Sequence, residues 1–295
     1  MKIMVLILLS MSLTACATSF KPDYSLIRNY SFDLQKEEPF KAPYYSKFNK
    51  NGKELFYIAA DHTSDRNSKT FKIISKAFND FRPDFVIVEG IKSGEVSRGF
   101  IKHVKKCFKD DNRRCGEPSF VSFNALNKKI PFEGGEPSDM QVIESAKLNG
   151  LAGEDVAYFY LLRISIQWKR QNKISDLNAK EMLSNFIPVI KKRFNNTVNI
   201  SYDGFKVWYS EKSGNNYNIK QLKNNDVAPI SNGSFFQQVN HKIGITRERN
   251  LLSRVANALN NHKKVLIVYG GGHFVKSKLV LEKMLGKATL VNNSL

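Results

Sequence analysis

The chain has 295 residues, a formal net charge of +19 at pH 7 and a hydrophobic content of 42%. This hydrophobic content is typical of globular domains and excludes an intrinsically disordered protein, and the length allows one large domain or two small ones. The excess of Lys and Arg is explained more simply by a basic surface without a specific site than by a polyanionic partner, for which anionic lipid headgroups and nucleic acid are the candidates.

The first residues have the pattern of a secretory signal. Lys2 precedes an apolar run over residues 3–9, which is too short to cross a bilayer, and small residues follow it. The motif Leu13-Thr14-Ala15-Cys16 resembles the lipobox of bacterial lipoproteins. This resemblance implies that residues 1–15 are a signal peptide that is removed, and that acyl chains such as palmitate on Cys16 hold the protein on a cell membrane.

Export bears on the partner and on the location. It argues against nucleic acid as the partner. Ala17 and Thr18 follow Cys16 without the Asp that commonly retains lipoproteins in the inner membrane, so in a Gram-negative cell we expect the outer membrane, facing the periplasm. Residues 16–52 are polar and lack periodicity, which favours a lipidated tether that leads, in extended form, into the folded domain.

The two remaining cysteines lie close together in the sequence. Cys107 and Cys115 flank a short polar stretch, and an exported protein occupies an oxidising compartment. We therefore predict a disulfide between them, worth ~2–3 kcal/mol by loop closure. Metal binding by the pair is the less favoured alternative, because no further Cys or His at zinc spacing accompanies it, although His103 is four residues from Cys107.

The first part of the folded domain predicts a β-α-β unit. Residues 55–60 form a short apolar run of the buried-strand type, and residues 85–88 form a second. Between them Phe71, Ile74, Phe78 and Phe81 share one face of a helix, which Pro83 ends. Strands joined in this way are parallel, with a right-handed crossover.

The middle of the chain is expected to be mostly helical. A third short strand is predicted over residues 130–132, and Ser138 or Asp139 is expected to cap the helix that starts near Met140. Residues 154–195 have a helical pattern. Residues 197–219 alternate Asn, Gly and Tyr with Val and Ile, which favours a small hairpin or an irregular insertion.

Strong signals return near the end. A helix is predicted over residues 247–261, a buried strand over 265–269, a closing helix, and a last strand over 288–291. The fold class is therefore α/β, with a mostly parallel central sheet flanked by helices. We expect a single domain over residues 53–295 with an insertion at about 155–245.

Polar groups follow several of the predicted strands. His62, Glu89, Glu136 and His273 each come at or just after an apolar run. Because sites in open α/β sheets form at the carboxyl ends of strands, these side chains are expected to converge. Two imidazoles with two carboxylates suit a divalent cation or acid–base catalysis.

At these residues the chain resembles the superfamily of the TraB/PrgY/GumN and TIKI proteins, which is related to the erythromycin-esterase and ChaN-like proteins. The resemblance covers residues 54–139 and 245–295. The chain differs from the family at Ala59, a position where the family has Gly. The motifs that carry it are Ala59-Ala60-Asp61-His62, Val-Ile-Val-Glu89, Arg247-Glu248-Arg249-Asn250 and Gly270-Gly271-Gly272-His273.

The resemblance implies a metal-dependent hydrolase of the peptidase or esterase type. His62, His273 and Glu89 would bind a divalent metal ion, with Glu89 alternatively acting as the general base. Glu136 would be a second acid. Arg249 or Arg247 would hold an acidic substrate group or an oxyanion, or would simply pair with Glu89 and Glu136. Further groups expected around the peptide or small-molecule substrate are Asp61, Gly270, Gly271 and Gly272.

Two other functions remain open. A haem- or iron-binding lipoprotein of the ChaN type needs one axial ligand, for which Tyr57, Tyr209 or Tyr269 is available. A regulatory binder would retain the fold without turnover. A hydrolase needs both histidines and both carboxylates around one cation, whereas a haem binder needs an apolar slot beside one exposed ligand.

Overall fold

The computed structural model describes residues 19–31, 33–34, 41–94, 96–109 and 115–291. The predicted signal peptide and Cys16 lie outside this range. None of the described helices combines the length and the apolar composition that crossing a membrane requires.

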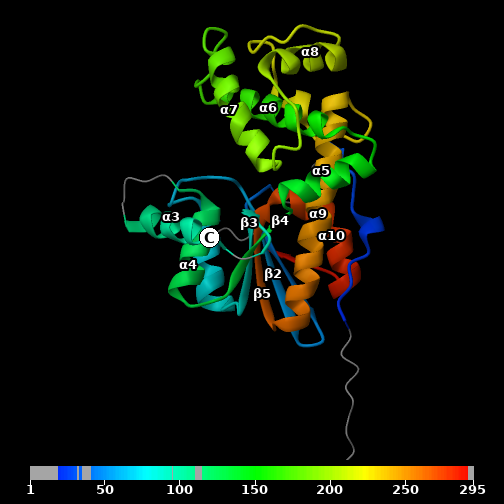
Figure 1. Ribbon diagram of the computed structural model, residues 1–295. Coiled ribbons are helices and arrows are strands. Elements are labelled where there is room, and N and C mark those ends of the chain that lie inside the picture. Colours follow the sequence, from blue (N-terminus) through cyan, green and yellow to red (C-terminus); the bar gives the residue numbers. More distant parts are fainter. Residues whose placement is uncertain (1–18, 32, 35–40, 95, 110–114, 292–295) are drawn as a thin grey trace, which may run out of the picture.

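A six-stranded mixed sheet forms the centre of the α/β domain, with strand order β4-β3-β5-β2-β1-β6 (Figure 1). Strands β2, β5, β3 and β4 run parallel, since β2 pairs with β5, β5 with β3 and β3 with β4, whereas β1 and β6 pair antiparallel on the β2 side of the sheet. The strands are β1 (Tyr44–Lys50), β2 (Lys53–Ala60), β3 (Phe85–Lys92), β4 (Phe132–Glu136), β5 (Lys264–Gly270) and β6 (Thr289–Val291).

Helices cover both faces of the sheet, which explains the continuous apolar runs of its strands. On one face α9 (Phe235–Asn261) and α10 (Gly271–Leu285) pack over Leu55 and Ile267. On the other face α2 (Lys69–Lys76) and α4 (Glu117–Asn127) pack over Ile58 and Leu266, and α3 (Arg98–Lys109) lies against α4. Successive residues of one strand thus enter different cores, as the pleat requires.

The helix predicted up to Phe81 changes its geometry before it ends. The α-helical part stops at Lys76, and a π-helical turn continues over Ala77–Phe81. Arg82 then adopts a left-handed conformation with φ 51°, and Pro83 prevents any continuation.

The insertion is a helical layer beyond one end of the sheet, built from α5 (Asp139–Leu148), α6 (Gly153–Arg170), α7 (Ala179–Arg193) and α8 (Tyr202–Ser213) (Figure 1). Ser138 caps α5 as predicted, because its Oγ accepts a hydrogen bond of 3.2 Å from the backbone N–H of Gln141. The hairpin expected over residues 197–219 is wrong: Ser201 caps a helix there, and Phe205 and Trp208 bury its apolar side.

The long helix α9 joins the insertion to the sheet. Its first half contributes Phe236, Val239 and Ile243 to the core of the insertion, and its second half contributes Leu252 and Val255 to the core against the sheet. The sequence predicted only the second half, because the first half is polar apart from these buried positions.

The sheet also extends beyond the predicted limits. The structure pairs Tyr44–Lys50 with Lys53–Ala60, so the folded domain begins before residue 53. The strand predicted over residues 130–132 is displaced, since β4 begins at Phe132 and continues to Glu136. Two short 3₁₀ turns complete the described structure, at Tyr24–Leu26 and Asn224–Val227.

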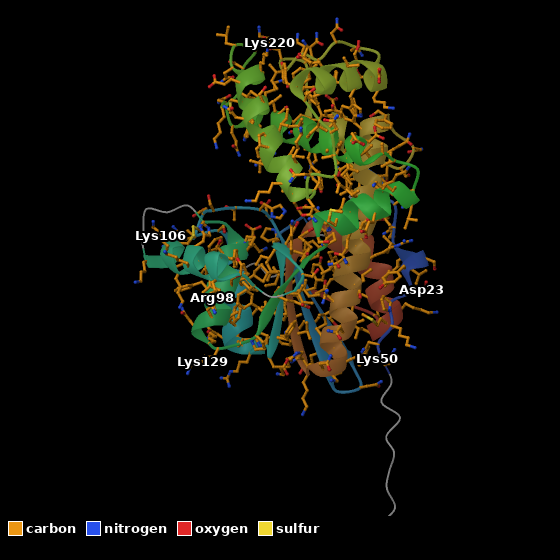
Figure 2. The ribbon with its side chains drawn as sticks, viewed as in Figure 1. Asp23, Lys50, Arg98, Lys106, Lys129 and Lys220 are labelled. Atoms are coloured by element: carbon orange, nitrogen blue, oxygen red, sulfur yellow. A yellow bond between two sulfur atoms is a disulfide. The ribbon has the colours of Figure 1, made fainter. Side chains whose placement is uncertain are left out.

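The positive charge is distributed over several elements. Figure 2 shows labelled basic side chains on the strand β1, on α3, after α4 and before the 3₁₀ turn of the insertion. These exposed residues are Lys50, Arg98, Lys106, Lys129 and Lys220. The arrangement agrees with a generally basic surface.

The predicted disulfide between Cys107 and Cys115 is present, and it joins the end of α3 to the start of α4. We expect the C107A/C115A double variant to lose ~2–3 kcal/mol of unfolding free energy because its denatured chain is less constrained. Chemical denaturation with and without reductant measures this loss. Reductant should destabilise the natural chain and leave the double variant unchanged, and an equal effect on both would contradict the prediction.

Candidate active site

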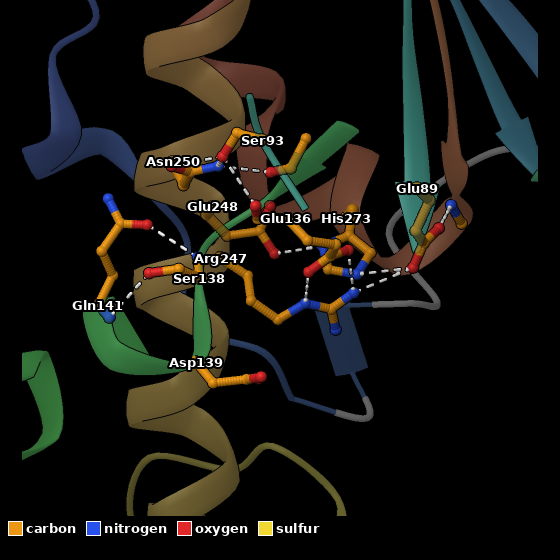
Figure 3. A network of polar contacts seen from close by, with 12 residues as sticks. Glu89, Ser93, Glu136, Ser138, Asp139, Gln141, Arg247, Glu248, Asn250 and His273 are labelled. Atoms are coloured by element: carbon orange, nitrogen blue, oxygen red, sulfur yellow. Dashed lines mark hydrogen bonds and ion pairs between the residues drawn. The ribbon is translucent and has the colours of Figure 1, made fainter. Parts of the chain in front are cut away.

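The structure brings His62, Glu89 and His273 together at the carboxyl edge of the sheet. His62 follows β2, Glu89 lies within β3, and His273 is in the first turn of α10, directly after β5. The Nε2 atom of His62 lies 3.8 Å from Oε2 of Glu89, and Nε2 of His273 lies 3.4 Å from Oε1 of the same carboxylate. The two imidazoles therefore face one carboxylate (Figure 3 shows Glu89 and His273).

A separate buried carboxylate holds the second nitrogen of each imidazole. Nδ1 of His62 lies 2.5 Å from Oε1 of Glu117, and Nδ1 of His273 lies 2.7 Å from Oε1 of Glu248. Glu117 is 4% exposed and Glu248 is 0% exposed. A carboxylate on the far nitrogen fixes the ring and its tautomer, and this arrangement is general among histidines that bind metals.

Glu117 and Glu248 were not identified from the sequence. Glu117 starts α4 only two residues after Cys115, so the disulfide anchors the backbone that presents it to His62. No local pattern distinguishes it from other acidic residues. Glu248 belongs to the Arg247–Asn250 motif. The sequence did not reveal that it is buried between α9 and α10, where Ser277 Oγ donates a hydrogen bond of 3.0 Å to it.

Glu89 is held by groups from two other elements. The backbone N–H of Gly270 donates to its Oε2 at 2.5 Å, and Arg247 donates to its Oε1 at 3.1 Å. Burial alone would raise the pKa of Glu89, but the positive charges of His273 and Arg247 hold that pKa below its ordinary value. Glu89 is therefore a carboxylate at neutral pH.

Gly270 leaves room for His62 to approach Glu89 closely. A Cβ atom at this residue would lie 2.9 Å from Nε2 of His62 and 3.4 Å from Oε2 of Glu89. Any larger residue would push the imidazole away from the carboxylate.

Arg247 connects two carboxylates. Its Nε and one terminal nitrogen donate to Glu136 at 2.6 and 2.7 Å, in the two-pronged geometry typical of Arg–carboxylate pairs. Both oxygens of Glu136 are thus engaged, so this residue positions Arg247 instead of presenting a free acid (Figure 3). Asn250 holds the same strand, β4, since its Nδ2 donates to the Gly135 carbonyl at 2.7 Å.

Arg249, the other predicted basic residue, is exposed and makes no hydrogen bond or ion pair within the described part of the chain. It lies one residue from buried Glu248 and two from Arg247, on a different side of α9. The structure thus selects Arg247 as the cation of the cluster.

The electrostatics of the cluster favour added positive charge. The hydrogen bond with Glu117 raises the pKa of His62 to about 9, and the negative charge of Glu248 raises the pKa of His273 despite its burial. Glu89, Glu117, Glu136 and Glu248 are compensated by only two permanent cations, Arg247 and Lys276. Two imidazolium protons, or one divalent cation on two neutral imidazoles, would balance the four carboxylates.

A cavity of about 590 Å³ opens beside the imidazoles. Asp61, Gly270, Gly271 and Gly272 line it together with both histidines. The side chain of His62 is 62% exposed, so a ligand in this cavity reaches its ring.

The donor set suits a divalent cation, although the ligand atoms stand apart. Two carboxylate-anchored imidazoles and a carboxylate are the ligands that zinc prefers. Within the described residues, the only His, Cys, Asp or Glu trio with ligand atoms all within 4.8 Å is His103, Cys107 and Cys115. Binding at Glu89 therefore requires the ligand atoms of His62, Glu89 and His273 to move closer together. The closer trio is not free to bind an ion, since its two sulfurs form the disulfide.

The tyrosines considered as haem ligands are poorly placed. Tyr57 and Tyr269 are each 1% exposed within the core against α9 and α10. Tyr209 is only half-buried, but it stacks on Phe236 in the insertion, with ring centroids 5.2 Å apart. None of the three lines the cavity beside the imidazoles.

Comparisons of the chain with models of protein families, with curated proteins and with solved structures find no match. The geometry of the cluster is therefore the basis for assigning a function.

We expect metal-free protein to lose stability as the pH rises from 6.5 to about 9. Since the pKa of His62 is raised to about 9 in the folded state, its contribution is complete below pH 6.5 and disappears as the proton is lost. Urea unfolding at several pH values measures this. E117Q should show a weaker pH dependence, not an absent one, because His273 acts in the same direction.

E144Q is the matched control, because Glu144 is exposed on α5. It should retain the natural pH dependence. An unchanged pH dependence in E117Q would contradict the assigned His62–Glu117 interaction.

Proposed function

We propose that the protein is a metal-dependent hydrolase with His62 and His273 as the core of its active site. The observation that carries this proposal is the pair of imidazoles, each anchored through Nδ1 to its own buried carboxylate, with both Nε2 atoms directed at Glu89. The motif resemblance to the TraB–TIKI superfamily supports the same reaction class.

A divalent cation would be held by Nε2 of both histidines and by Glu89. Such an ion lowers the pKa of a bound water and polarises a substrate carbonyl. The unbalanced charge of the four carboxylates supports binding, since a divalent cation replaces two imidazolium protons. Coordination thus releases protons instead of concentrating further positive charge.

The protein groups have separate roles in this proposal. Glu89 orients both imidazoles and binds the ion with them, or alternatively accepts a proton from the attacking water. Arg247 keeps Glu89 ionised and stabilises negative charge that develops on the substrate. Glu117, Glu136 and Glu248 are positioning residues, because each acts through His62, Arg247 or His273 respectively.

The proposed location is a membrane surface. Lipid on Cys16 would tether the domain, and the exposed Lys and Arg side chains of Figure 2 would hold it close to anionic headgroups.

The hydrolase proposal predicts that H273A loses cation binding and lowers hydrolysis about 100-fold or more, since even indirect support of a ligand is worth about 10–100-fold. Zn²⁺ titration calorimetry on the metal-stripped mature protein measures binding. A fluorogenic peptide library and p-nitrophenyl esters measure turnover.

H103A is the control, because His103 is exposed and touches only the disulfide region. It should leave both measurements unchanged. Loss of Zn²⁺ binding in H103A but not in H273A would show that the ion binds near His103 and not at Glu89. A Soret band on haem titration without Zn²⁺ binding would favour the haem-binding function, and Zn²⁺ binding without any turnover would favour the regulatory binder.

The proposed tether predicts that C16S moves the protein from the membrane fraction to the soluble fraction of the expressing cells, because the lipid attachment site is removed. Fractionation followed by immunoblotting measures this. C107A/C115A, which removes the other cysteines, should remain in the membrane fraction, and a membrane-bound C16S would contradict lipid anchoring.

A further inference from the structure

A groove separates the insertion from the carboxyl edge of the sheet. It consists of a smaller cavity of about 230 Å³, which Arg247 and Glu136 line from below, and a larger one of about 390 Å³ within the insertion. The two cavities share Tyr160, Arg163 and Arg193. We refer to them together as the insertion groove.

Most cations of the smaller cavity are already paired. Arg193 donates to Asp139 at 2.9 and 3.2 Å, and Lys92 pairs with the same carboxylate. Arg247 pairs with Glu136 (Asp139, Glu136 and Arg247 are labelled in Figure 3). Positive charge from four side chains thus meets only two carboxylates among the residues that line this cavity.

Arg163 is the exception. It projects from α6 into both cavities, is exposed, and has no hydrogen bond or ion pair to any residue that the structure describes. Its guanidinium stays protonated at neutral pH and is repelled by the nearby positive charge of Arg247. An anion beside Arg163 would relieve this repulsion.

The number of unpaired positive charges in the smaller cavity indicates which kind of anion would bind there. Arg247 is shared between Glu136 and Glu89, so Arg163 is the one cation of the smaller cavity without a carboxylate of its own. A singly charged group with two acceptor oxygens matches the fork of a guanidinium. A carboxylate meets both requirements, whereas phosphate at neutral pH has a larger charge.

Arg247 links this groove to the imidazoles. It lines the smaller cavity and donates to Glu89, which both histidines face. A ligand with its anionic end at Arg163 therefore lies on the other side of Arg247 from the site of hydrolysis.

We propose that the insertion groove binds a substrate carboxylate through Arg163, and thereby selects acidic substrates. The carboxylate binding follows from the groove alone, and its role as a substrate subsite rests on the proposed hydrolase.

The test is calorimetric titration of the mature protein with N-acetylglycine, with N-acetylglycine amide as its uncharged counterpart. We expect the carboxylate to bind and the amide not to bind. R163Q should weaken the binding at least about tenfold, in line with the loss of one charge-assisted hydrogen-bond pair. R163Q is not expected to unfold the protein, because the side chain is exposed and unpaired, and thermal melting checks this.

K180Q is the control, because Lys180 is an exposed cation of the insertion, on α7, that lines neither cavity. It should bind as the natural chain does. Equal binding of acid and amide, or unchanged binding in R163Q, would overturn the proposal. Tighter binding of inorganic phosphate than of N-acetylglycine would overturn the assignment to a carboxylate.

H273A separates this proposal from the proposed hydrolase. Carboxylate binding should persist in H273A, since His273 does not line the groove. If hydrolysis fails everywhere while R163Q still loses the ligand, the hydrolase is wrong and the anion site stands. If a hydrolysed substrate is found, R163Q should raise KM for its acidic form more than for its amide.

Discussion

The rest of the site depends on how the buried charge of the Glu89 carboxylate is compensated. It is 9% exposed, and a buried charge without partners costs several kcal/mol. Gly270, Arg247 and two imidazoles supply the compensation. Each charged partner is held in place by a further carboxylate, so the site is a network of alternating charges. Loss of one group leaves a buried charge unpaired, which costs about 3–5 kcal/mol of folding free energy.

The helix α9 makes this network sensitive to the position of the insertion. Ile243 packs in the core of the insertion, Leu251 packs against the sheet, and Arg247 and Glu248 lie between these two anchor points. A rigid helix cannot move one end without displacing the middle. The insertion therefore contributes to the geometry at Glu89 as well as supplying Arg163 to the groove.

Sequence reasoning was least successful where packing overrides local pattern. The segment that forms α8 contains Gly204 and is bounded by Gly214, both typical of turns, yet Phe205 and Trp208 bury a helical face in the insertion. The strand β1 was assigned to the tether because its neighbours are polar, whereas its pairing with β2 buries Tyr44 and Phe48. Glu117 had no signal, since its role depends on the disulfide and on His62, which is remote in sequence.

Apolar periodicity and cysteine content are local properties, so the sequence was enough to predict the α/β class, the strands β2, β3 and β5, and the disulfide, and it located β4 only approximately. Only the folded structure shows which carboxylate holds each imidazole, that Arg247 and not Arg249 reaches Glu89, and that Arg163 is unpaired among the described residues. These are matters of distance and orientation between elements far apart in the chain, and no local pattern specifies them.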